Sequence, residues 1–190
     1  MWALLSGVIG FLIAYLFDWA SIKRVPGGKQ VIIFLFVALQ GYALYAACWG
    51  VSQFYMPVAI SWLGWFLLPI SVTLLSYSLF MEIPFTKTYL KSATGDQLVT
   101  TGTYALVRHP WILWYALTLA SLLLATQSKV LLIATPVWVM MGIIRVVIQD
   151  RYFFPHMFPH YPRYKEQTPM LIPTRGSIAA CIKTFKEVPR

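Results

Sequence analysis

Residues 111–148 read WILWYALTLASLLLATQSKVLLIATPVWVMMGIIRVVI, and this stretch determines the fold class. It contains two apolar runs, 111–126 and 130–148, which are separated only by Gln127, Ser128 and Lys129. A helix needs about 20 predominantly apolar residues to cross the hydrocarbon core of a bilayer. The stretch therefore predicts two transmembrane helices in a tight antiparallel hairpin, of which the first is short for a crossing.

Three further apolar segments precede this hairpin, at residues 2–19, 31–51 and 57–81. Of all residues, 59% are apolar and 11% are charged, whereas soluble domains have about 45–50% and about 25%. A soluble globule of this length has too little interior to bury so much apolar surface, and a disordered chain would be far more polar. We predict an all-α integral membrane bundle of about five transmembrane helices, forming one domain over residues 1–190.

The formal net charge of +9 is explained by where the basic residues lie. With five crossings, fourteen of the fifteen Lys and Arg residues fall on one side of the membrane, and only Lys129 falls on the other. The positive-inside rule then places the N-terminus outside and the C-terminus in the cytoplasm. Because the basic residues flank apolar runs, we expect a lipid bilayer and no nucleic acid as the partner. The N-terminal segment lacks a signal peptide's basic start and cleavage site, so we expect a retained helix.

Two polar clusters lie on the predicted cytoplasmic side. The first, residues 96–110, reads DQLVTTGTYALVRHP and leads into the fourth apolar segment. It has a purely structural explanation, in which Pro110 starts a helix, Arg108 extends to lipid head groups and Tyr104 lies in an interfacial aromatic belt. The second cluster begins at Arg145, inside the last apolar segment. Arg145 is either a functional residue or one whose side chain extends to the interface.

The chain offers few groups for metal or nucleophilic chemistry. Two of its three histidines, His156 and His160, are spaced to share one helix face. Pro155, Pro159 and Pro162 interrupt any helix there, so we predict no metal site. The sequence contains no glycine-rich nucleotide-binding fingerprint, and two cysteines form no disulfide framework. The absence of a G-x-x-x-G motif leaves the oligomeric state open.

The sequence resembles a known superfamily over roughly residues 85–175. The first half of the resemblance is LVTxGxY at 98–104 followed by RHP at 108–110, and the second is YxxY at 161–164 followed by TPxLxP at 168–173. In this order and spacing they are similar to the isoprenylcysteine carboxyl methyltransferase and phospholipid methyltransferase superfamily. The resemblance implies a cytoplasmic C-terminal segment that helps to bind S-adenosylmethionine at the membrane interface.

The resemblance also implies a set of site residues. The implied cofactor contacts are Gln97, Leu98, Val99, Tyr104, His109, Pro110, Trp111, Ile112, Gln149 and Asp150. Asp150 would also act in catalysis by holding the methionine amine, and Arg145 would orient the acceptor. Two positions depart from the family pattern: Ile112 replaces the usual tyrosine, and Gln149 replaces the first residue of an acidic pair.

The function that this resemblance implies is methyl transfer to a lipid-like or prenylated-cysteine-like acceptor at the cytoplasmic interface. Methyl transfer from a sulfonium depends mainly on positioning the two reactants, which suits a site with few charged groups. Two alternatives stay open: an NADPH-dependent membrane sterol or enone-type reductase, and a degenerate, non-catalytic membrane accessory protein. The C-terminal stretch from Gly176 is expected to be either a short amphipathic surface helix or a loose end.

Overall fold

The computed structural model describes residues 1–23, 28–49, 52–83 and 98–185. The regular secondary structure in these ranges is helical, as the sequence predicts. The helices, including two π-helical turns, are α1 (Trp2–Lys23), α2 (Gly28–Cys48), α3 (Val58–Ser76), η1 (Tyr77–Met81), α4 (Thr103–Leu106), α5 (Pro110–Thr126), α6 (Lys129–Ile148), η3 (Gln149–Phe153), α7 (Phe154–Met157), α8 (Tyr161–Gln167) and α9 (Arg175–Thr184).

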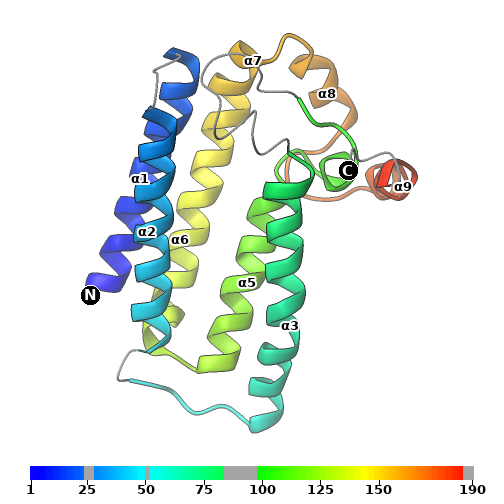
Figure 1. Cartoon of the computed structure of the whole chain (residues 1–190). Helices are drawn as coiled ribbons and strands as arrows, with labels where there is room; N and C mark the ends of the chain where they lie inside the picture. Colours follow the sequence, from blue (N-terminus) through cyan, green and yellow to red (C-terminus); the bar gives the residue numbers. More distant parts are fainter. Residues whose placement is uncertain (24–27, 50–51, 84–97, 186–190) are drawn as a thin grey trace.

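Helices α1, α2, α3, α5 and α6 run lengthwise through the molecule and form an antiparallel bundle (Figure 1). Within the described ranges, four helical segments are long and apolar enough to cross a membrane, namely Trp2–Ala20, Gln30–Cys48, Val58–Met81 and Lys129–Met157. The fifth lengthwise helix, α5, is also apolar but has only 17 residues, which corresponds to about 26 Å. The structure therefore confirms a helical membrane bundle and the short fourth segment, while the side on which each end lies stays a prediction.

The hairpin between α5 and α6 is as tight as the sequence predicts. Pro110 occupies the first turn of α5, where its missing N–H is not needed. Gln127 ends α5 with a left-handed backbone conformation at φ 53°. The hydroxyl of Ser128 then caps α6 by accepting hydrogen bonds from the amides of Val130 and Leu131. Two residues thus suffice to reverse the chain.

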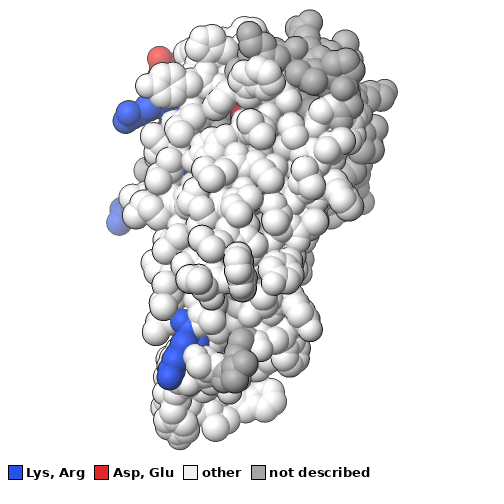
Figure 2. All heavy atoms as spheres, turned by 90° about the vertical axis from the view of Figure 1, so that its left-hand side faces the viewer, with Lys and Arg blue, Asp and Glu red and all other residues white. Residues whose placement is uncertain are grey.

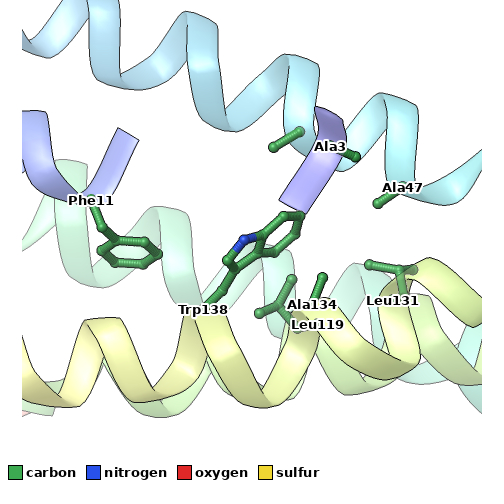
Figure 3. Close-up of a cluster of buried hydrophobic side chains, with 8 residues drawn as sticks. Ala3, Phe11, Ala47, Leu119, Leu131, Ala134 and Trp138 are labelled. Carbon is green, nitrogen blue, oxygen red and sulfur yellow. The ribbon is translucent and has the colours of Figure 1, made fainter. Parts of the chain in front are cut away.

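Small residues allow the lengthwise helices to approach closely. The indole of Trp138 on α6 is fully buried against α1 (Figure 3), and its Nε1 donates to the carbonyl of Leu4 at 3.3 Å. A Cβ atom on Gly7 would lie 2.3 Å from this ring. Between α3 and α5, a Cβ on Gly64 would lie 2.4 Å from the backbone nitrogen of Ala125. Both contacts therefore require glycine, as is common where helices pack in a membrane.

The outer surface of the bundle is apolar. Exposed side chains along it include Phe34 on α2 and Trp62 and Phe66 on α3. The side of the molecule drawn in Figure 2 carries few charged residues on an otherwise continuous uncharged surface. Such a surface suits contact with lipid chains.

The short helices α4, α7, α8 and α9 gather at one end of the bundle, which we call the site end (Figure 1). Helices α1, α3 and α6 finish there and α5 begins there. The C-terminal stretch forms a helix, α9, whose start is closed by reciprocal hydrogen bonds between Thr174 and Ser177. Of the two expectations for this stretch, the helix is confirmed.

Candidate functional site

A cavity of about 410 Å³ lies at the site end and extends into the bundle. This volume falls within the range of about 300–1,000 Å³ that is usual for pockets of small ligands. Its wall is mostly apolar, with Phe11 of α1, Phe36 of α2 and Leu119 of α5 among the deeper lining residues. The polar lining includes the charged residues Asp18, Arg108 and Arg145, together with His109, Gln149 and several tyrosines. The cavity can therefore hold a ligand with both a polar part and a hydrocarbon part.

The structure brings most of the predicted site residues to this cavity. The predicted residues that line it are Leu98, Val99, Tyr104, His109, Trp111, Arg145 and Gln149. As far as the described residues show, Pro110, Ile112 and Asp150 are not part of the lining. Gln97 lies outside the described residues.

Arg108 joins the two halves of the sequence resemblance. Its Nε donates to Asp150 at 2.8 Å, and its Nη1 donates to the carbonyls of Thr168 at 2.6 Å and Lys165 at 3.0 Å. Its backbone amide donates to the carbonyl of Pro169 at 2.9 Å. Arg108 is only 7% exposed, so the expectation that it extends to lipid head groups is wrong. Its guanidinium instead holds the segment after α8 against the start of α5.

Asp150 lies at the centre of this buried network. Besides Arg108, its carboxylate accepts hydrogen bonds from the hydroxyl of Tyr161 at 2.6 Å and contacts Nζ of Lys165 at 2.8 Å. Nε2 of His109 lies 3.7 Å away. Burial and the neighbouring carboxylate raise the pKa of Tyr161, so its hydroxyl stays protonated and donates. Three donors thus surround this carboxylate.

Gly102 forms the turn that leads into α4, and Tyr104 lies in the first turn of this helix. Gly102 has φ 60° and ψ −131°, a conformation that side chains disfavour. The Tyr104 hydroxyl donates to the carbonyl of Ser78 at 3.1 Å, and the Tyr164 hydroxyl donates to the carbonyl of Tyr104 at 2.6 Å. Tyr104 is buried, so the expectation that it lies in an aromatic belt is wrong. These contacts place its ring in the cavity wall.

Glu82, which the sequence analysis missed, anchors the same turn from the end of η1. Its carboxylate accepts hydrogen bonds from the backbone amide of Thr103 at 2.6 Å and from the Thr103 hydroxyl. Burial raises the pKa of Glu82, and the two hydrogen bonds from Thr103 oppose that rise. A glutamate directly after an apolar segment was the only signal of this role in the sequence.

His109 and Gln149 line the cavity, and each also has a buried polar atom that lacks a hydrogen-bond partner among the described residues. His109 is 2% exposed and stacks on Phe154, with ring centroids 5.4 Å apart. Burial lowers its pKa, although Asp150 opposes this effect, so the imidazole is neutral at pH 7. Among the described residues, neither Nε2 of His109 nor Oε1 of Gln149 has a hydrogen-bond partner. Leaving such a buried group unpaired costs about 1–3 kcal/mol, and this cost is removed when a ligand supplies the partner.

Arg145 is paired with a residue that the sequence analysis did not single out. Its Nε and Nη2 donate to the carboxylate of Asp18 on α1, at 3.1 Å and 3.2 Å. The Arg145 side chain is 14% exposed, so the alternative that it extends to the interface is wrong. Its guanidinium carbon lies 5.8 Å from the centroid of the Trp111 ring. The available signal for Asp18 was a lone carboxylate within an apolar run, which usually has a buried partner.

Three other residues that the sequence singled out, Ile112, His156 and His160, are not part of the cavity lining. Ile112 is buried between α5 and α6, where a Cβ on Gly142 would lie 2.3 Å from its Cδ1. His156 lies on α7 and His160 precedes α8. The chain is extended at Phe158 between them, so the predicted interruption of the helix is confirmed.

Comparison with known proteins adds one match. A family model described as phospholipid methyltransferase matches residues 60–161, which is more than half of the chain. The matched region runs from α3 to the first residue of α8 and leaves α1 and α2 outside. No curated protein and no solved structure matches the chain.

Proposed function

Since the chain belongs to the phospholipid methyltransferase family, we propose that it transfers a methyl group from S-adenosylmethionine to a lipid-like acceptor inside the cavity at the site end. The family supports a membrane methyltransferase of this general kind. The use of S-adenosylmethionine and the lipid-like acceptor are our proposal. The observation that carries it is a mostly apolar cavity lined by His109 and Gln149, each of which has a buried polar atom without a hydrogen-bond partner among the described residues.

The described residues fit S-adenosylmethionine. Neutral His109 and the carbonyl of Gln149 offer hydrogen bonds to its polar groups, and Leu98 and Val99 offer apolar contact. Aromatic rings suit a cation such as a sulfonium, and Tyr104 and Tyr161 both line the cavity. When bound, the cofactor supplies an electrophilic methyl group.

The chain itself contributes positioning and the exclusion of water. Arg108 and Asp150 hold α8 and the RHP motif together, so that Tyr161, Tyr164 and His109 share one wall. In a displacement reaction, holding the two reactants in line removes much of the barrier. We therefore assign Asp150 a positioning role, because its carboxylate is already surrounded by three donors. The apolar walls of α1, α2 and α5 receive the hydrocarbon part of the acceptor.

Calorimetry with S-adenosylhomocysteine on the purified protein in detergent tests the cofactor. We expect saturable binding that weakens at least tenfold in His109→Ala and in Gln149→Ala. His156→Ala is the matched control, because this exposed histidine on α7 does not belong to the cavity lining. Saturable heat with NADPH in place of S-adenosylhomocysteine would favour the reductase alternative, and binding of neither would favour an accessory role.

A labelled-methyl transfer assay on host membranes tests the acceptor. We expect the label in a lipid fraction, and label in a prenylated protein fraction would redirect the acceptor assignment. We also expect Arg145→Ala to lower turnover while cofactor affinity stays within threefold of the wild type. An equal loss of both would mean that Arg145 acts in cofactor binding or folding.

A further inference from the structure

A buried carboxylate neutralises the positive charge that faces the acceptor side of the cavity. Asp18 is 5% exposed and lies on α1, outside the region that the family model matches. Its two oxygens accept separate hydrogen bonds from Nε and Nη2 of Arg145. Asp18 and Arg145 both line the cavity. The pair therefore presents two opposite charges there and little net charge to a ligand.

The same carboxylate determines how the amide of Gln149 is turned. Nε2 of Gln149 donates to Oδ1 of Asp18 at 2.9 Å. An ionised carboxylate only accepts hydrogen bonds, so the NH₂ group of Gln149 must face it. Oε1 of Gln149 remains buried with no hydrogen-bond partner among the described residues. Only a group that donates a hydrogen bond satisfies this atom.

We propose that Asp18 is a specificity-determining residue, which makes the cavity select an acceptor whose methyl-accepting group donates a hydrogen bond and carries no negative charge. Amines, alcohols and thiols meet this condition, and a carboxylate does not. The inference rests on the proposed function, because it concerns the acceptor of that same site. The hydrocarbon part of the acceptor lies deeper, against Phe11, Phe36 and Leu44.

The physical basis is that charges interact strongly where water is excluded. Asp18→Asn keeps an oxygen that accepts from Arg145 but removes the negative charge, which leaves the guanidinium uncompensated. The same change frees the amide of Gln149 to turn and present its NH₂ group. Both effects favour an anionic head group. Arg145→Gln acts in the opposite direction, because it leaves Asp18 as the uncompensated charge.

Competition between three single-chain amphiphiles tests this proposal without any cofactor. The full chain in a non-ionic detergent at pH 8 is mixed with equal amounts of dodecylamine, dodecanol and dodecanoate, and native mass spectrometry counts the bound molecules. We expect the ratio of bound amine or alcohol to bound dodecanoate to be at least ten in the wild type. Asp18→Asn should lower this ratio at least tenfold, Arg145→Gln should raise it, and the double variant should return near the wild-type value.

Glu166→Gln is the matched control, since it removes one exposed carboxylate at the same end of the bundle. Equal ratios in Asp18→Asn and Glu166→Gln would overturn the proposal. Equal loss of all three amphiphiles in Asp18→Asn would also overturn it, because that result indicates a purely structural residue. Binding of S-adenosylhomocysteine, measured in parallel, keeps the two proposals apart: its absence in the wild type would refute the cofactor assignment, while the amphiphile ratios would still decide the role of Asp18.

Discussion

Replacing Arg108 with glutamine should detach the C-terminal half of the site from the bundle without unfolding the bundle. The wild-type guanidinium donates to Asp150 and to the carbonyls of Lys165 and Thr168, and glutamine cannot reach all three. Breaking a buried ion pair by removing one partner costs about 3–5 kcal/mol. Asp150 keeps Tyr161 and Lys165 as partners, so we expect the lower end, about 3 kcal/mol.

This free energy corresponds to a roughly hundredfold shift in the equilibrium between docked and undocked α8, because each change of about 1.4 kcal/mol alters an equilibrium constant tenfold. Hydrogen exchange with mass spectrometry, on the protein in lipid nanodiscs, measures it directly. Amides of residues 161–168 should exchange about a hundredfold faster in Arg108→Gln, whereas those of α3 and α5 should keep their rates. Arg151→Gln is the control, because it removes a cation whose side chain is exposed on η3.

Two results would refute this reasoning. Acceleration below about threefold at residues 161–168 would show that the backbone contact between Arg108 and Pro169, together with the tyrosines, holds α8 alone. A uniform acceleration across the bundle would show that Arg108 stabilises the whole fold rather than one junction. Both results are visible in the same data set.

Three further predictions concern packing, pH and the hairpin. Gly64→Ala should destabilise the protein by about 1–3 kcal/mol because its methyl group meets the backbone of α5, while Gly41→Ala, with open space around it, should not lower the thermal midpoint in detergent. Burial lowers the pKa of His109 below 6.5, so between the two pKa values the unfolded chain binds more protons than the folded one. The folded state therefore loses stability as the pH falls below about 6.5. Thermal midpoints measured from pH 8 to 5 should fall more steeply in the wild type than in His109→Gln. Ser128→Ala should cost about 1–2 kcal/mol, because Ser128 caps α6 and donates to the carbonyl of Ala47 at 2.6 Å, and denaturant titration measures this loss.

Most of the fold could be predicted from the sequence, because the length of each apolar run and the residues at each turn determine local structure. The predicted segment at 130–148 differs from α6 by one residue at its start, and the hairpin turn at Gln127 and Ser128 is as expected. Helix α9 is one of the two expectations for the stretch from Gly176, the other being a loose end. What decided between them was the reciprocal hydrogen bonding between Thr174 and Ser177.

The site was predicted less completely, because pairing between distant segments leaves no local pattern. Arg145 was recognised as unusual, but its partner Asp18 lies 127 positions earlier in the chain. Arg108 belongs to a motif that names no partner for it, and its side-chain hydrogen bonds run to residues 42 to 60 positions away. An ion pair can form wherever two helices bring the groups together, so the sequence alone allowed several partners for each.

The two walls of the cavity have different origins in the chain, and this affects how acceptor preference can change in evolution. One wall, built from α3 to α8, lies within the family-matched region except for Tyr164, and the other is formed by α1 and α2, which precede that region. Under the proposed function, in which the acceptor lies against α1 and α2, substitutions in these two helices alter the acceptor while the opposite wall keeps its sequence. The same proposal implies that proteins sharing the family-matched region but carrying different first and second helices act on different acceptors, and searches based on the shared region alone would not tell them apart.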